Sequence, residues 1–206
     1  SSHVLFVIDT AFPQLNIINP AANSTNTTDI LLDVLFMITE SGTLLDSVWY
    51  SNDSYSINLS LGSAGVWANI TNVTWSQGTH NVRVYANDSA NNVNLSTRTF
   101  TIDSVIPAIN FTVLTTTNGS YSRNSIDVNV TANDSTTLLT GINITLYYLN
   151  GSIYNSSFSA TGGIYSSFAL NYTGLLDGTY ILNASANDTL NNRNFSETRS
   201  YLLDTT

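Results

Sequence analysis

The stretch ANDSANNVNLSTRTFTID at residues 86–103 recurs, with substitutions, as ANDTLNNRNFSETRSYLLD at residues 186–204. In each copy an alternating apolar and polar run leads into a polar turn, and a second alternating run ends in Asp. Asp and Asn suit such turns because their side chains bond the local backbone and tolerate left-handed conformations. The repeat therefore predicts a β-hairpin in each copy, closing a module.

The spacing of the closing Asp residues predicts the domain organisation. Asp9, Asp103 and Asp204 lie roughly a hundred residues apart, which is the size of one β-sandwich domain. Residues 1–9 have the pattern of the second hairpin strand and its Asp, without the strand that should precede it. The expected divisions are residues 1–8 as a strand that completes a preceding module, residues 9–102 as module 1, and residues 103–204 as module 2.

Residues 29–38 (DILLDVLFMI) fit either a helical stripe or a strand. The corresponding residues 124–134 (NSIDVNVTAND) alternate strictly, which favours a strand in both copies. Further strands are expected at 47–53, 55–61 and 66–75 in module 1, and at 145–151, 152–159 and 164–173 in module 2. About seven short strands per module, separated by turn-rich segments, predict an all-β chain of two tandem immunoglobulin-like β-sandwiches.

Strand periodicity also predicts which aromatic side chains are buried. Alternation places Val48, Tyr50, Leu146 and Tyr148 on inner faces, and Trp67 and Trp75 are expected in the core or at its rim. Trp49, Tyr85 and Tyr147 fall on the outer face, where they could stack on sugars, dock a neighbouring subunit, or pack under a glycan or the adjacent module.

The order Asp…Pro, VWYSND, GTHNVRVYANDSANN and FTID resembles the tandem Ig-like repeats of prokaryotic, especially archaeal, cell-surface proteins. The resemblance covers nearly the whole chain, twice over. It implies that Asn91 and Asn191 replace a turn Gly and keep its left-handed conformation. It also places Tyr180 at a tyrosine corner, whose hydroxyl bonds nearby backbone. His80 takes that position in module 1.

Composition excludes several functions. The chain has no Cys and no Lys, five Arg and a formal net charge of −9, which argues against nucleic acid or anionic membranes as partners. No stretch predicts membrane insertion. Two His (His3 and His80) in strand patterns, without a phosphate loop or a zinc motif, provide no catalytic constellation, so we expect no enzyme.

Nineteen Asn-x-Ser/Thr sequons are present, whereas roughly seven are expected by chance from the Asn, Ser and Thr content. The expected glycan acceptors are Asn23, Asn26, Asn52, Asn58, Asn69, Asn72, Asn87, Asn94, Asn110, Asn118, Asn129, Asn133, Asn143, Asn150, Asn155, Asn171, Asn183, Asn187 and Asn194. Asn129 with Thr131, Asn143 with Thr145, and Asn183 with Ser185 occupy the polar parity of strands. The alternative is a surface rich in Ser, Thr and Asn that forms sequons incidentally. Dense N-glycosylation predicts an extracellular or cell-surface location.

Calcium is a weaker hypothesis. Asp88, Asp103 and Asp188, together with Asp9 and Asp204, offer hard oxygen ligands near the ends of the expected modules. Turn formation explains the same residues without a metal, and we favour that interpretation. No cofactor other than covalent N-glycans is therefore expected.

These features predict a structural, heavily N-glycosylated repeat module of an extracellular filament, stalk or S-layer-like array, whose partners are adjacent repeats or copies of itself. Val4, Phe6 and Ile8 are the expected assembly strand, completing a sandwich of the same chain or of a neighbouring subunit. The alternative is an adhesin whose Ig-like modules bind glycans or cells through exposed aromatic side chains and loops.

Overall fold

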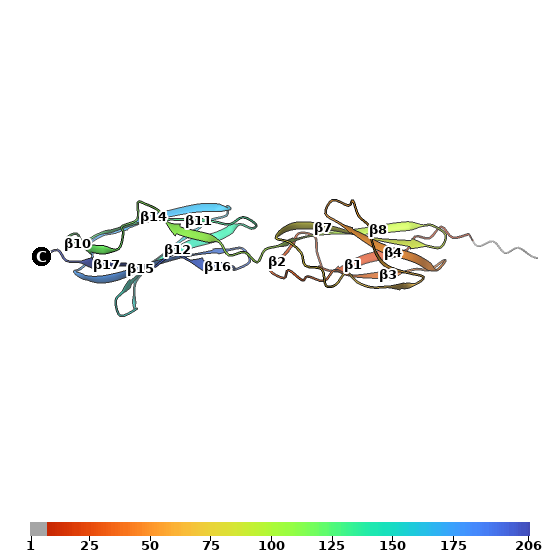
Figure 1. The fold of residues 1–206 in the computed structure, drawn as a ribbon, viewed down its shortest axis with the longest axis horizontal. Helices are drawn as coiled ribbons and strands as arrows, with labels where there is room; N and C mark the ends of the chain where they lie inside the picture. Colours follow the sequence, from red (N-terminus) through yellow and green to blue (C-terminus); the bar gives the residue numbers. More distant parts are fainter. Residues whose placement is uncertain (1–7) are drawn as a thin grey trace, which may run out of the picture. The chain divides into compact units, whose positions relative to one another are not determined.

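Residues 8–206 are described by a computed structural model and form strands, turns and bends without a helix (Figure 1). The chain divides into two compact units, Ser1–Asp103 and Ser104–Thr206, referred to below as module 1 and module 2. Val4 and Phe6 of the expected assembly strand lie outside the described residues. Ile8 is described, is almost fully exposed and belongs to no strand.

Module 1 contains two sheets. A small antiparallel sheet pairs β1 with β3, and a larger sheet has the order β2-β8-β7-β4-β5-β6, in which β2 runs parallel to β8. The strands are β1 (Gln14–Asn19), β2 (Thr25–Thr27), β3 (Leu35–Thr39), β4 (Leu45–Asn52), β5 (Leu59–Ser63), β6 (Val66–Trp67), β7 (Gly78–Asp88) and β8 (Val93–Ile102).

Module 2 repeats this plan, but its smaller sheet has three strands instead of two. The order is β14-β11-β9 in one sheet and β10-β17-β15-β12-β13 in the other, with β16 paired to β15. The strands are β9 (Ala108–Phe111), β10 (Gly119–Tyr121), β11 (Ile126–Asn133), β12 (Leu139–Tyr148), β13 (Ile153–Ala160), β14 (Tyr165–Tyr172), β15 (Gly178–Asp188), β16 (Arg193–Phe195) and β17 (Arg199–Leu203). Both modules are immunoglobulin-like β-sandwiches.

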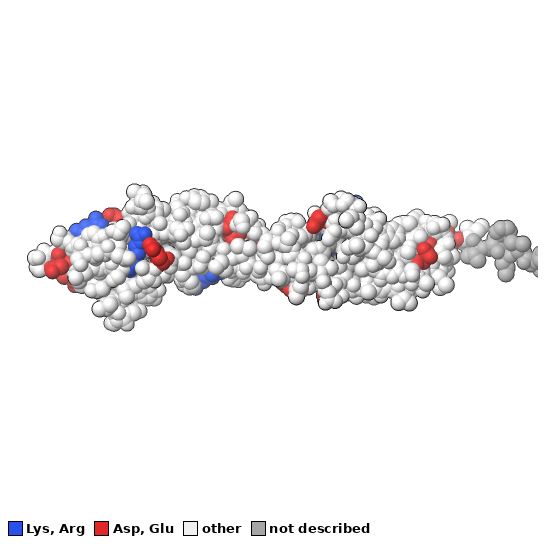
Figure 2. Space-filling view, in the orientation of Figure 1, with Lys and Arg blue, Asp and Glu red and all other residues white. Residues whose placement is uncertain are grey.

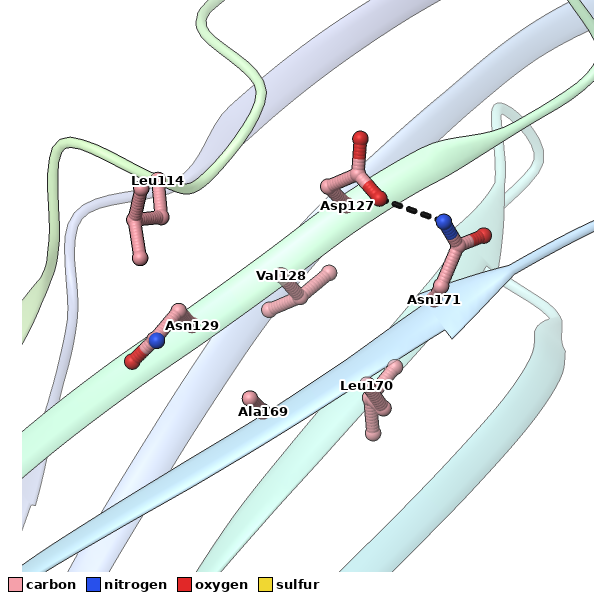
Figure 3. A pocket seen from close by; sticks show the side chains of 7 residues that line it. All are labelled: Leu114, Asp127, Val128, Asn129, Ala169, Leu170 and Asn171. Atoms are coloured by element: carbon pink, nitrogen blue, oxygen red, sulfur yellow. Dashed lines mark hydrogen bonds between the residues drawn. The ribbon is translucent and has the colours of Figure 1, made fainter.

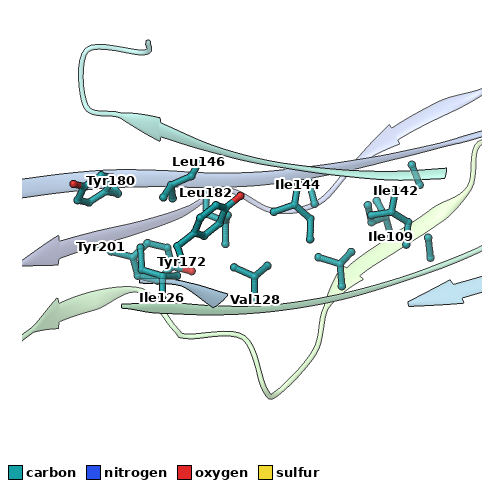
Figure 4. Close-up of a cluster of buried hydrophobic side chains, with 14 of the residues drawn as sticks. Ile109, Ile126, Val128, Ile142, Ile144, Leu146, Tyr172, Tyr180, Leu182 and Tyr201 are labelled. Carbon is teal, nitrogen blue, oxygen red and sulfur yellow. The ribbon is translucent and has the colours of Figure 1, made fainter. Parts of the chain in front are cut away.

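Strict alternation fills each core from both sheets. Along β7 every second residue from His80 to Asp88 is buried, and β11 buries every second residue from Ile126 to Ala132. In module 2 Val128 of β11 and Ile144 of β12 point toward one another between the sheets (Figure 4). The predicted hairpins form β7–β8 and β15–β16, so the repeated stretch closes each sandwich.

The expected strand at residues 29–38 is wrong in its first half. Asp29 starts a turn instead, because its Oδ1 accepts the Leu31 N–H and its carbonyl accepts the Leu32 N–H. The strand begins at Leu35, after an isolated bridge at Val34.

The expected strand at residues 66–75 is also mostly absent. It is reduced to β6 and a bridge from Ile70 to Val34, and Asn72 has a left-handed φ of 59° that no strand accommodates. In module 2 the corresponding stretch forms the complete strand β14.

Candidate functional site

None of the nineteen acceptor Asn side chains is buried. Ten are exposed and nine are partly buried. The exposed acceptors are Asn23, Asn26, Asn58, Asn72, Asn110, Asn118, Asn133, Asn150, Asn155 and Asn171. Charged groups are sparse on the surface between them (Figure 2).

Three acceptors share the outer face of the β14-β11-β9 sheet in module 2. Asn129 on β11 and Asn171 on β14 border a shallow depression of about 560 Å³ that also contains the exposed Leu114, and Asn110 lies on β9 (Figure 3). Asn171 Nδ2 donates to Asp127 Oδ1 across the two strands. Sugars attached at Asn129 and Asn171 would therefore project over the same apolar depression.

The acceptor Asn residues of the central strands lie on the outer face, as expected. Two of the hydroxyl residues in their sequons are nevertheless not exposed. Thr145 on β12 and Ser185 on β15 are buried. Thr145 Oγ1 lies 3.1 Å from both Asn143 Nδ2 of the same strand and Ser156 Oγ of the adjacent strand β13, and these side chains cover it. A central strand has neighbours on both sides, and period-two alternation alone does not reveal this crowding.

Asn94 and Asn194 have a structural role that the sequence did not reveal. Asn94 Nδ2 donates to the Pro13 carbonyl at 2.8 Å, and Asn194 Nδ2 donates to the Pro107 carbonyl at 2.9 Å. In each case the Oδ1 also accepts the N–H of the following residue. Each amide thus fixes the segment that leads into its own module, and a sugar on Nδ2 would compete for that space.

The polar turns behave as expected. Asn91 and Asn191 adopt left-handed φ values of 66° and 65°. In the first turn Asp88 Oδ1 accepts the N–H groups of Ala90 and Asn92. Asp188 does the same in the second turn. Burial alone would raise the pKa of Asp88, but hydrogen bonds from Asn92 and Ala90 outweigh it and leave the pKa below its usual value.

The tyrosine corner expected at Tyr180 is present, and His80 makes an equivalent hydrogen bond in module 1. The Tyr180 hydroxyl donates to the Leu176 carbonyl at 3.1 Å. His80 Nε2 lies 2.9 Å from the Ser76 carbonyl oxygen, the same four residues back, and Nδ1 lies 3.1 Å from Asp53 Oδ2. Both ring nitrogens of this buried histidine are therefore engaged by structural partners.

The aromatic predictions are mostly confirmed. Trp75 is buried, Trp67 packs at the edge of the core, and Trp49 stacks on Tyr85 on the outer face with ring centroids 5.2 Å apart. The prediction for Tyr148 is correct for the face but not for burial, because Tyr148 lies opposite the buried Tyr180 in the sheet and is nevertheless 43% exposed. It lies at the end of β12, where its ring packs on that of Tyr180 at the edge of the core.

A second depression of about 430 Å³ lies on the outer face of the larger sheet of module 2. Phe158, Arg193 and the acceptors Asn143 and Asn187 line it. Phe158 is 60% exposed, and the Arg193 guanidinium lies 4.7 Å above the Phe195 ring. An exposed ring beside donors could hold a sugar, either a bound one or one attached to the chain.

Among the predicted calcium candidates, Asp88, Asp103 and Asp188 lie at strand ends and are fully buried. Asp9 is partly buried and Asp204 is exposed. One carboxylate oxygen of Asp88 lies within 4.8 Å of oxygens of Asp9 and Glu40, and Asp188 is similarly close to Asp134. Asp103 follows β8, where its N–H donates to the Thr27 carbonyl. Glu40 and Asp134 are additional candidates that the sequence did not reveal.

Within residues 8–206 no helix has the length and apolar character that crossing a bilayer requires. Neither a protein-family model nor a curated protein matches the sequence. Many solved structures are similar to this chain in a structural comparison.

Three of these solved structures are compared with this chain by their identity to it, their TM-score and the share of each chain that is covered. Fibronectin(III)-like modules of Clostridium thermocellum CbhA are 13% identical, with a TM-score of 0.39, over 93% of this chain and 94% of theirs. A tetra-tandem repeat from the extending region of a large adhesion protein is 16% identical, with a TM-score of 0.48, over 95% of this chain and 50% of that protein. The D00-D0 domain of intimin is 12% identical, with a TM-score of 0.47, over 93% of this chain and 100% of that domain.

Proposed function

We propose that this chain is a structural repeat module of an extracellular surface filament, stalk or S-layer-like array, and that N-glycans cover its surface. The observation that carries the proposal is that nineteen acceptors, more than twice the number expected by chance, all have unburied side chains in the folded chain. With only 9% charged residues, the chain needs another source of solubility.

The sheet edges support a protective role for the sugars. Module 2 has four edge strands at the ends of its two sheet orders, and each carries or adjoins an acceptor. These are Asn110 on β9, Asn171 on β14, Asn155 on β13 and Asn118 immediately before β10. Proteins often block such edges with Lys or Pro, and this chain has no Lys. Bulky sugars would hinder unwanted strand pairing at all four edges.

The exposed apolar side chains are consistent with the same proposal. Leu114 lies beside Asn129 and Asn171, and Phe158 lies beside Asn143 and Asn187. Sugars attached there would cover apolar surface that is otherwise in water. The partners of such a module are adjacent repeats or further copies, which meet at surfaces that the glycans leave bare.

A glycopeptide map of the native chain tests this proposal. We expect occupancy at the edge acceptors Asn110, Asn118, Asn155 and Asn171, because their side chains are accessible. We expect Asn94 and Asn194 to be bare, because each Nδ2 bonds a Pro carbonyl. Unmodified edge acceptors would contradict the proposal.

A matched pair of variants tests the edge argument. Asn155→Gln removes the acceptor on edge strand β13, whereas Ser152→Ala abolishes the sequon of Asn150 in the turn of the same hairpin. Sedimentation should show self-association of the glycosylated chain for Asn155→Gln only. Equal behaviour of the two variants would exclude a role for the sugars at this edge.

The second candidate is a glycan-binding adhesin, which the exposed Phe158 and the nearby Arg193 favour. Unmodified Asn143 and Asn187, together with saturable oligosaccharide binding that Phe158→Ala removes, would support this alternative. Occupied acceptors in the same depression would exclude external sugars and support the structural role.

A further inference from the structure

Three carboxylates from separate segments meet at one end of module 1. Asp9 precedes β1, Glu40 follows β3, and Asp88 ends β7, and one oxygen of each lies within 4.8 Å of the others. None of the three belongs to an ion pair within residues 8–206. The five Arg side chains of the chain make their contacts elsewhere.

Hydrogen bonds engage both oxygens of Asp9 and of Asp88 and one oxygen of Glu40. Glu40 Oε1 accepts the N–H groups of Ser41 at 2.7 Å and Gly42 at 3.0 Å. Glu40 Oε2 is buried and has no hydrogen-bond partner. The turn is complete without this second oxygen, so turn formation does not account for its position.

Module 2 repeats the arrangement with different residues. Asp134 Oδ1 accepts the N–H groups of Thr136 and Thr137, while Oδ2 is buried without a partner. Asp134 is only 4% exposed, and one of its oxygens lies within 4.8 Å of a carboxylate oxygen of the fully buried Asp188. In the sequence repeat Asp103 holds the place of Asp9.

Buried carboxylates without a partner are costly, and neighbouring carboxylates repel one another. One bound cation removes both penalties, because it neutralises the charges and occupies the free oxygen. A carboxylate oxygen that already accepts a hydrogen bond keeps a second lone pair for a metal. The free oxygen recurs at the corresponding turn of both modules, after β3 in ITESG and after β11 in TANDS, although one turn uses Glu and the other Asp. This recurrence indicates a ligand rather than a local accident.

We infer that each module binds a calcium ion, held in module 1 by Asp9, Glu40 and Asp88 and in module 2 by Asp134 and Asp188. Calcium accepts six to eight oxygen ligands in flexible geometry, whereas magnesium requires a near-ideal octahedron and retains its waters. Zinc prefers nitrogen and sulfur ligands, which these clusters lack. In module 1 the ion joins the leading segment at Asp9 to the small sheet through Glu40 and to the large sheet through Asp88.

The test uses the full chain after treatment with a chelator. All three Trp residues (Trp49, Trp67 and Trp75) lie in module 1, so their fluorescence reports unfolding of that module alone. Calcium chloride should give a saturable calorimetric signal and raise the Tm seen by Trp fluorescence by on the order of 10 °C at about a hundredfold excess over Kd. Absence of both effects, or an equal response to magnesium chloride, would overturn the assignment.

Glu40→Gln distinguishes calcium binding from a purely structural turn. Gln keeps the acceptor for Ser41 and Gly42 but removes a negative charge. The variant should be at least as stable as the unchanged chain in chelator and should lose most of the calcium-induced Tm shift. Asp33→Asn, an exposed change outside the cluster, should retain the full shift. Equal shifts in both variants would overturn the proposal.

Asp134→Asn tests module 2 in the same chain. It should remove about half of the calorimetric stoichiometry and leave the Trp-detected shift of module 1 intact. Unchanged stoichiometry would overturn the site in module 2. The calcium measurements do not depend on glycan occupancy, so their outcome is separate from that of the proposed structural role.

Discussion

The two modules fill the same corner of the sandwich with different residues. Module 1 packs Trp75 and His80 against Phe100, with centroid distances of 4.9 Å and 5.6 Å to the Phe100 ring. Module 2 has Leu175, Tyr180 and Tyr201 at the corresponding places in the repeat. Neither set is a conservative copy of the other, although both lie in the hydrophobic core or against it.

The shared feature is the supply of donors to backbone carbonyls. Trp75 Nε1 donates to the Leu32 carbonyl at 2.8 Å in module 1. In module 2 the side chain of Leu175 has no hydrogen-bond donor. There the Tyr201 hydroxyl donates to the Thr116 carbonyl at 2.8 Å. At this corner the fold therefore requires that the volume be filled and that the backbone carbonyls be hydrogen-bonded, and it does not require particular residue types.

Trp75→Leu places the residue of module 2 in module 1 and should have the largest effect. It removes the bond to Leu32 and leaves a cavity beside Phe100, which Leu cannot fill, so we expect a loss of about 3 kcal/mol in the free energy of unfolding. Denaturant unfolding followed by the fluorescence of Trp49 and Trp67 measures it. A loss under about 1 kcal/mol would mean that the corner repacks freely.

Tyr180→Phe and Tyr201→Phe form a matched pair in module 2. Removing the Tyr180 hydroxyl leaves the Leu176 carbonyl without this donor, and we expect a loss of about 1 kcal/mol. Tyr201→Phe should cost less, because Arg199 Nη1 also donates to the Thr116 carbonyl at 3.0 Å. Thermal unfolding followed by circular dichroism tests the order, and the reverse order would contradict the role of Arg199.

The comparison also shows how far the sequence predicts the fold. Local signals were sufficient where one residue type satisfies the backbone by itself, as in the left-handed turns at Asn91 and Asn191. They were insufficient at Asp29–Asp33, where an Asp side chain competes for backbone N–H groups within an apolar run.

The candidate sites divide in the same way. Sequons identify acceptors directly, but the bond from Asn94 to Pro13 joins residues 81 positions apart and has no local signal. The carboxylate clusters combine a conspicuous turn Asp with Glu40 or Asp134, whose sequence contexts differ. Only the register of the strands brings these residues together.

Alkaline pH should lower the stability of module 2 more than that of module 1, by a smaller amount than the substitutions above. Burial raises the pKa of Tyr172 to about 12 and also raises the pKa of Tyr180 and Tyr201 in module 2, whereas in module 1 burial raises that of Tyr50. The unfolded chain ionises its tyrosines near pH 10. A raised folded-state pKa gives stability that is complete below about pH 10 and is lost as the pH rises toward about 12.

Module 2 should therefore lose more stability than module 1 between about pH 10 and pH 12. Guanidinium unfolding measured in parallel by Trp fluorescence and by circular dichroism assigns each transition to its module. Tyr201→Phe removes one of the buried phenols and should reduce the alkaline loss in module 2, with Tyr165→Phe, an exposed tyrosine, as its control. Equal alkaline losses in the two modules would mean that buried phenols do not set this difference, and that the corner residues differ in packing alone.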